Sequence, residues 1–266
     1  MQPVSSSTKI GISFLVLFVL YHAAEYMIVF RDSPAGFFLF QFLFFLAAWR
    51  LGHWYAASGL TVWGLPFTAR SFKLFLIGIG VGCILYGVPY ALALYLGVEV
   101  ILRVPDGVPL VKSTLPFAFG VLFSSLSEDM LTRGLIYQYY HPKLKPLGLI
   151  LLSASVYLLN HIYRLTDGPE TWLYLFLLGV IFLIPVLFTR NLWLTGGMHW
   201  AGNTVFFVTH SVIQTEESRG PLSANALFAG WLLVCIPLLL LLCRRLPQIL
   251  KSRTSDFSLK PARHES

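Results

Sequence analysis

Long apolar runs separated by short polar connectors dominate the chain. A helix needs about 20 apolar residues to cross the roughly 30 Å hydrocarbon core of a bilayer. Turn-forming groups such as Asp32-Ser33-Pro34 separate eight runs that meet or nearly meet this length. The runs are residues 10–30, 36–57, 74–97, 115–140, 147–163, 171–189, 192–212 and 226–243. This pattern predicts an all-α, polytopic membrane protein, a bundle of about eight transmembrane helices.

The composition supports the membrane interpretation and argues against nucleic acid as a partner. Hydrophobic residues make up 56% of the chain and charged residues only 12%, whereas soluble domains carry about 25% charged residues. We therefore expect residues 1–266 to form one integral, multi-pass membrane domain surrounded by the lipid bilayer. The net charge of +7 does not indicate nucleic-acid binding, because the basic residues are not clustered on one soluble face.

Basic residues are divided unevenly between the two sets of connectors. With eight spans, the side that holds both termini carries twelve of the Lys and Arg residues, and the opposite side carries five of them with seven acidic residues. The positive-inside rule therefore predicts that both termini are cytoplasmic. The basic segment 244–266 is predicted to be a cytoplasmic tail that contacts anionic lipid. The Trp-containing segment 58–70 is predicted to lie along the cytoplasmic membrane interface.

Three charged residues lie about halfway along the fourth apolar run. Each charge at that depth costs roughly 2.5–3.5 kcal/mol on insertion scales unless it pairs or faces a wet cavity. Asp129 and Arg133 are four residues apart, the spacing of an intrahelical ion pair. Glu128 points about 100° away from Asp129 around the helix. One arginine is therefore not expected to satisfy both acids, and Glu128 is available for another role.

Two further runs carry polar residues inside the membrane. His161 lies in the fifth run, and His199 and Asn203 lie in the seventh. Because His199 and Asn203 are four residues apart, both side chains project from one helix face. Glycines in the seventh run would let a neighbouring helix approach closely. His22 and Glu25, near the outer end of the first run, are interpreted as a pair at the membrane interface.

A glutamate, two histidines and an asparagine on three helices would suit hydrolysis. Glu128 can act as general base on a water that His161 helps to hold, and His199 and Asn203 can donate to an oxyanion. The alternative is a zinc ion bound by Glu128, His161 and His199. Residue spacing leaves both chemistries open. The chain contains no HExxH, GxSG or GxGD motif, so other intramembrane hydrolase designs are not indicated.

The three polar segments resemble the motifs of the CAAX protease and bacteriocin-processing family, also called the Abi family. Residues 127–134, SEDMLTRG, resemble its EExxxRG motif. Residues 157–161, YLLNH, are similar to its FxxxH motif, and residues 199–203, HWAGN, match its HxxxN motif. The order and the distances between motifs also fit. The resemblance covers about residues 115–212, which we take as the family core.

Two positions depart from the family pattern. Asp129 stands in place of the second glutamate, and Tyr157 in place of the phenylalanine. Neither position is a proposed base or oxyanion donor. The resemblance implies that Arg133 orders the acidic pair, so Asp129 and Arg133 are expected to support the site.

The family resemblance implies an intramembrane endopeptidase related to the type II CAAX prenyl endopeptidases. In that family's pattern, Glu128 and His161 would activate water, and His199 and Asn203 would form the oxyanion site. The glutamate mechanism needs no metal, so we expect no cofactor, although family members are often labelled metalloproteases. The expected substrate is a membrane-embedded or lipidated peptide, prenylated or not, that is cleaved near its C-terminus.

Two other function classes stay open at this level. A non-catalytic bacteriocin-immunity or membrane binding protein of the same family would use the polar cluster to grip a partner. A proton-linked transporter would use the buried Glu and His residues as a proton relay, but the chain shows no repeated halves or broken helices. The variant Glu128→Gln separates these classes from a hydrolase, which alone would lose peptide cleavage.

Overall fold

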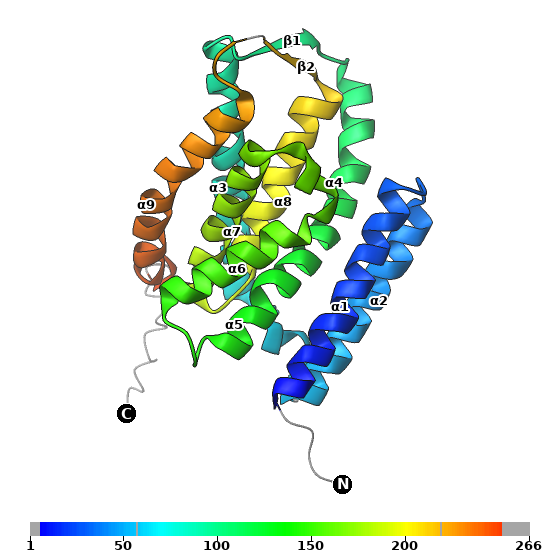
Figure 1. The fold of residues 1–266 in the computed structure, drawn as a ribbon, viewed down its shortest axis with the longest axis vertical. Coiled ribbons are helices and arrows are strands. Elements are labelled where there is room, and N and C mark those ends of the chain that lie inside the picture. Colours follow the sequence, from blue (N-terminus) through cyan, green and yellow to red (C-terminus); the bar gives the residue numbers. More distant parts are fainter. Residues whose placement is uncertain (1–5, 57, 219, 252–266) are drawn as a thin grey trace, which may run out of the picture.

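The protein is a stack of helices of different tilt, with one small sheet at one end (Figure 1). The computed structural model describes residues 6–56, 58–218 and 220–251. The α-helices are α1 (Ser6–Val29), α2 (Pro34–Ala56), α3 (Ala69–Tyr95), α4 (Gly107–Asp129), α5 (Leu135–Tyr140), α6 (Pro146–Asn160), α7 (Pro169–Thr189), α8 (Trp193–Phe207) and α9 (Ala224–Lys251). Shorter 3-10 or π-helical segments are Gly59–Trp63, Met130–Gly134, Ile162–Asp167 and Val208–Val212.

The helices coincide with the eight predicted apolar runs, and the all-α, polytopic membrane fold is confirmed. Within the described residues, six helical stretches are long and apolar enough to cross a membrane, and one of them runs from Gly107 through Tyr140. Helix α6 is also apolar but has only 15 residues. Helix α8 has 15 residues and continues as a π-helical turn to Val212. The count of eight spans is therefore approximate, because these two helices are short.

A two-stranded antiparallel sheet joins segments that the sequence pattern placed in connectors. Strand β1 (Glu99–Arg103) pairs with β2 (Gln214–Glu217), with Glu99 opposite Glu217. The sheet lies at the end of the molecule opposite the start of α1 and the end of α9 (Figure 1). It joins the chain just before α4 to the chain just after α8. Strands this short and this far apart in sequence leave no local periodicity to detect.

The segment between α2 and α3 folds inward. Its 3-10 helix, Gly59–Trp63, ends in a fully buried indole, and Trp63 Nε1 donates to the Ala48 carbonyl at 2.8 Å. Gly64 follows with a φ of 92°, a left-handed conformation that glycine adopts without steric cost. Trp63 is thus a core residue, although it belongs to the segment predicted to lie along the membrane interface.

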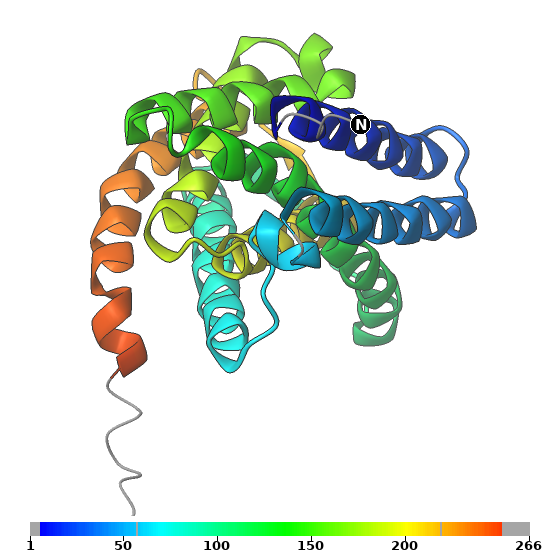
Figure 2. The ribbon, with the colours of Figure 1, turned by 90° about the horizontal axis from the view of Figure 1, so that it is seen from below.

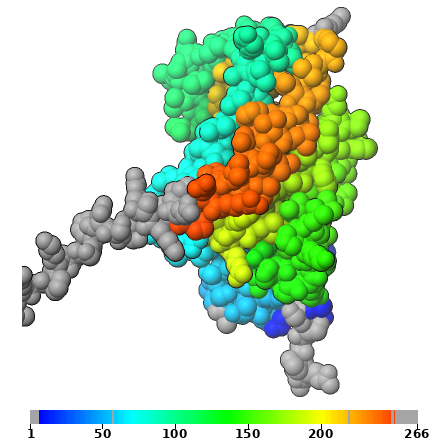
Figure 3. Space-filling model, turned by 90° about the vertical axis from the view of Figure 1, so that its left-hand side faces the viewer, coloured from blue at the N-terminus to red at the C-terminus, as the bar shows by residue number. Residues whose placement is uncertain are grey.

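Helix α9 extends further than the apolar run that predicted it. It continues past Cys243 to Lys251, and Leu246 is buried. The polar tail predicted from residue 244 therefore begins as helix, and its residues 252–266 lie outside the described residues. Figure 3 shows α9 lying across one face of the molecule, between α3 and the α6–α7 region.

Close helix packing surrounds α8 and sets where its polar side chains lie. A Cβ atom on Gly197 would collide with the Phe75 carbonyl of α3, and one on Gly202 would collide with the Tyr86 ring. The expectation that glycines in this run allow close approach is therefore confirmed. The α1–α2 hairpin lies to one side of these helices (Figure 2).

Candidate active site

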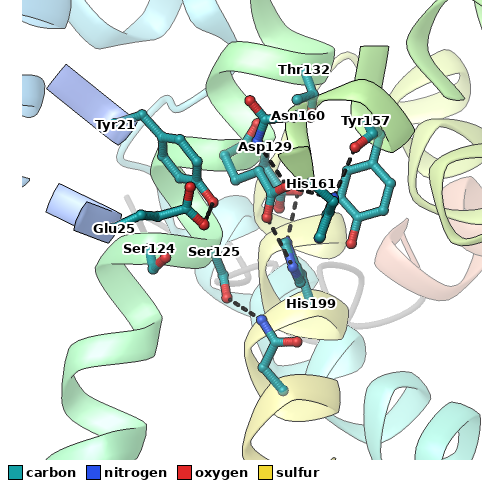
Figure 4. A network of polar contacts seen from close by, with 12 residues as sticks. Tyr21, Glu25, Ser124, Ser125, Asp129, Thr132, Tyr157, Asn160, His161 and His199 are labelled. Atoms are coloured by element: carbon teal, nitrogen blue, oxygen red, sulfur yellow. Dashed lines mark hydrogen bonds and ion pairs between the residues drawn. The ribbon is translucent and has the colours of Figure 1, made fainter. Parts of the chain in front are cut away.

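The carboxylate of Glu128 is the point where side chains from three helices meet. Glu128 lies in the last turn of α4 and is only 4% exposed. Asn160, the last residue of α6, donates from Nδ2 to Glu128 Oε1 at 3.1 Å. His161 Nδ1 lies 3.6 Å from the same oxygen, and His199 Nε2 lies 3.5 Å from Oε2. A buried carboxylate is thus surrounded by one amide and two imidazoles (Figure 4).

The chain directly after Glu128 is a π-helical turn, Met130–Gly134. Such single π turns occur frequently at functional sites. The turn carries Arg133, whose Nη1 lies 2.5 Å from Asp129 Oδ1, and both side chains are fully buried. The predicted ion pair between these two residues is present. Arg133 also lies over the Tyr157 and Phe182 rings, at 4.4 and 4.9 Å from their centroids, which adds cation–π attraction.

Asp129 has a second contact that the sequence did not reveal. Its Oδ1 lies 3.1 Å from His199 Nδ1. A carboxylate accepts hydrogen bonds, so His199 donates from Nδ1 and turns Nε2 toward Glu128. With the ring held in this way, Nε2 donates a hydrogen bond only when His199 is an imidazolium. Asp129 therefore links the ion pair of α4 to the imidazole of α8.

His161 is held by its own helix. It follows the last residue of α6, and its Nδ1 donates to the Tyr157 carbonyl at 2.8 Å. In the neutral ring, Nε2 is then the nitrogen that can accept a hydrogen bond from water. The side chain is 20% exposed, more than the other groups around Glu128. His161 is thus the histidine of the site that water reaches most easily.

Asn203 lies one turn along α8 from His199. Its Nδ2 donates to Ser125 Oγ of α4 at 3.3 Å, and its side chain is half-buried. The structure thus gathers Glu128, His161 and His199 around one point. It places Asn203 beside them, held by a serine that precedes Glu128 by three residues.

The helices that carry these side chains lie in a segment that matches a known protein family. Residues 110–205 match the family model described as type II CAAX prenyl endopeptidase Rce1-like. The family resemblance is thereby confirmed. The comparisons with curated proteins and with solved structures give no match. The Rce1-like segment runs from α4 into α8 and includes Glu128, His161, His199 and Asn203.

Asn160 of the Rce1-like segment was missed as a site residue. The only sequence signal was a polar residue in an apolar run, next to His161. Neighbouring positions on a helix point about 100° apart, which argued against both side chains reaching Glu128. Helix α6 ends at Asn160, and His161 leaves the helical conformation with a ψ of 49°. The two neighbouring side chains can therefore reach the same carboxylate.

Helix α1 reaches the site from outside the Rce1-like segment. His22 is buried, and its Nε2 lies 3.3 Å from the Asn160 carbonyl while Nδ1 lies 3.0 Å from the Phe18 carbonyl. Glu25 lies 3.9 Å from His22. The expected pair of His22 and Glu25 is present, but His22 is buried in the protein, where it contacts the end of α6.

The side chains named as alternative zinc ligands fit a metal poorly in this geometry. His161 presents Nδ1 to Glu128, and that nitrogen donates to the Tyr157 carbonyl, so it has no lone pair to offer there. Across the described residues, no three His, Cys, Asp or Glu side chains are arranged to hold a metal ion.

Proposed function

We propose that this protein is an intramembrane endopeptidase that hydrolyses a peptide bond near the C-terminus of a membrane-anchored or prenylated substrate. One observation carries the proposal: the buried carboxylate of Glu128 has an amide and two imidazoles within 3.6 Å. An ionisable side chain inside the bilayer costs free energy, and such residues are typical of functional sites. The match of residues 110–205 to a CAAX protease family supports the same reaction class.

The reaction begins with water beside Glu128. Glu128 accepts a proton from the water as its oxygen attacks the carbonyl carbon of the scissile bond. The free Nε2 of His161 accepts the other water hydrogen and orients the nucleophile. A C–O bond forms, and the carbonyl π electrons move to oxygen. The apolar surroundings raise the free-energy cost of burying the Glu128 charge. They also strengthen the electrostatic attraction between Glu128 and the water proton.

The oxyanion that forms needs hydrogen-bond donors. Asn203 can supply its amide, which Ser125 holds at 3.3 Å. His199 can donate from Nε2 in its imidazolium form, which Asp129 stabilises through Nδ1. When the intermediate collapses, the C–N bond breaks and Glu128 returns its proton to the leaving amine. The products are a carboxylic acid, which keeps the second water hydrogen, and an amine, and Glu128 is again ionised.

The decisive test is the variant Glu128→Gln, compared with the wild type in cells that lack the gene. The membrane proteome is digested and its C-terminal peptides are compared, so that the substrate need not be known beforehand. We expect Glu128→Gln to reduce cleavage by at least about 100-fold, because a general base contributes 10² to 10⁴ in rate.

The matched control is Glu99→Gln. Glu99 is also a buried carboxylate near a histidine, with His210 Nε2 at 3.1 Å from Oε1, but it lies at the sheet. This variant should cleave normally. Wild-type C-termini in cells that express Glu128→Gln would overturn the proposed protease and leave the non-catalytic membrane protein as the better interpretation.

We further propose that hydrolysis needs no metal. The purified protein should therefore keep its activity after treatment with a strong chelator, and elemental analysis should find no stoichiometric zinc. The reason is that the His161 nitrogen nearest Glu128, Nδ1, donates to the Tyr157 carbonyl and therefore has no lone pair to offer a metal ion. Activity that disappears on chelation and returns with Zn²⁺ would contradict this mechanism.

A further inference from the structure

A cavity of about 370 Å³ lies between the α1–α2 hairpin and residues 116–124 of α4. Its walls are mostly apolar and include three phenylalanines, with Ile28 from α1, Phe37 and Phe38 from α2, and Phe117 from α4. Two polar residues also line it, Glu25 and Ser124. The proposed mechanism uses neither of them.

The two polar residues lie at the same end of this cavity. Helix α1 runs from Glu25 toward its turn with α2, whereas α4 runs away from the sheet end toward Ser124. Ser124 precedes Glu128 by four residues, which is about 6 Å along a helix. Figure 4 shows Glu25 beside Tyr21, on the side of α4 where Ser124 lies. One end of this apolar cavity is therefore polar, and it is the end nearer to Glu128 along α4.

The carboxylate of Glu25 is only partly satisfied. The Tyr21 hydroxyl donates to Oε1 at 3.2 Å, and Oε2 has no hydrogen-bond partner among the described residues. His22 Nε2 lies 3.9 Å from Oε2 and 3.3 Å from the Asn160 carbonyl oxygen. The Glu25 side chain keeps 25% exposure. An ionised carboxylate can accept about four hydrogen bonds, so Glu25 has unused acceptor capacity, although Oε2 itself is buried.

Building on the proposed protease function, we propose that Glu25 is a specificity-determining residue that binds a lysine or arginine side chain of the peptide substrate. The alkyl stem of such a side chain would pack against the phenyl rings of the cavity, and its charged end would reach Glu25. An apolar slot that ends in a carboxylate selects long basic side chains for this reason.

The test measures binding, so it does not depend on turnover. Two fluorescent twelve-residue peptides of alanine and leucine differ at one central position, lysine in one and norleucine in the other. Norleucine keeps most of the alkyl stem and lacks the ammonium group. Both are titrated onto the full chain in lipid nanodiscs, in the Glu128→Gln background that prevents cleavage. We expect the lysine peptide to bind about tenfold more tightly, which corresponds to one desolvated ion pair.

Variants of Glu25 then show whether this residue is the cause. Adding Glu25→Gln should abolish the preference for lysine, and Glu25→Asp should keep part of it. Glu25→Lys should reverse it, so that a peptide with glutamate binds better than one with glutamine. Glu99→Gln, a buried carboxylate outside the cavity, should leave the preference unchanged. Size-exclusion profiles identify any variant that fails to fold. If Glu25→Gln fails to fold, Glu25→Asp is compared with the protein that keeps Glu25.

The outcomes separate this inference from the proposed function. Equal binding of the two peptides, or no binding of either, overturns the role of Glu25 even if the wild type cleaves substrates. A lysine preference that depends on Glu25 supports the role even if no cleavage is found, and only the protease proposal would then fall.

Discussion

Asp129 shows how one side chain supports two parts of the site. Its Oδ1 contacts both Arg133 and His199, while Oδ2 has no hydrogen-bond partner among the described residues. The ion pair neutralises Arg133, which is fully buried. The same oxygen fixes the ring of His199. A shorter acid than the family's glutamate thus still reaches both partners, because the π-helical turn places Arg133 against it.

Replacing this acid should destabilise the protein. In Asp129→Asn, the guanidinium of Arg133 stays buried without a counter-charge, and breaking a buried pair in this way costs about 3–5 kcal/mol. We expect a clear loss of thermal stability in detergent, measured by scanning fluorimetry. Asp129→Glu should recover part of it. The double variant Asp129→Asn with Arg133→Met should be more stable than Asp129→Asn alone, and an unchanged melting temperature in Asp129→Asn would contradict this account.

Helix α1 acts on the site as an element, although it lies outside residues 110–205. His22 contacts the carbonyl at the end of α6, where helical carbonyls lack an intrahelical partner. That end carries Asn160 and His161, the two side chains of α6 that approach Glu128. His22 thus links α1 to the end of α6 that approaches the carboxylate.

Removing the His22 contact should slow catalysis and leave substrate binding intact. His22→Leu leaves the Asn160 carbonyl unsatisfied, at a cost of about 1–3 kcal/mol, and we expect kcat to fall about tenfold with little change in KM. His22→Gln, which keeps a donor for the carbonyl, should restore most of the rate. The control Tyr26→Leu changes an exposed residue one turn further along α1. A rise in KM at constant kcat would instead place His22 in substrate binding.

The fourth apolar run contains a π-helical turn that its hydrophobic pattern did not predict. A single helix was predicted over residues 115–140, and the structure divides this region into α4, a π-helical turn and α5. Apolar periodicity does not distinguish a π turn from an α turn, because one extra residue per turn changes the pattern very little. The turn nevertheless determines where Arg133 lies.

At the scale of the whole molecule, the two ends differ. One end carries the β1–β2 sheet, and the start of α1 and the end of α9 lie toward the other (Figure 1). The excess of Lys and Arg belongs to the second end in the predicted topology. We propose that this end is cytoplasmic, as the positive-inside rule predicts. The cavity lined by Glu25 would then lie in the outer half of the membrane.

Reporter fusions test this orientation directly. Green fluorescent protein fused at either terminus should fluoresce, and alkaline phosphatase fused there should be inactive, because these reporters work on opposite sides of a bacterial membrane. A phosphatase inserted at Asp106, between β1 and α4, should be active. Active phosphatase at the termini would reverse the assignment and place the Glu25 cavity toward the cytoplasm.

The local features of this protein follow from the sequence alone. The lengths of the apolar runs predicted the helices, and the i, i+4 spacing predicted the Asp129–Arg133 pair, because both depend on residues close together in the chain. Contacts between distant segments were decided only by the tertiary structure. Examples are the approach of Asn160 to Glu128, the bond from Asp129 to His199, the turn of His22 toward α6 and the β1–β2 pairing. Each depends on how helices cross and where a helix ends, and residue spacing does not record either.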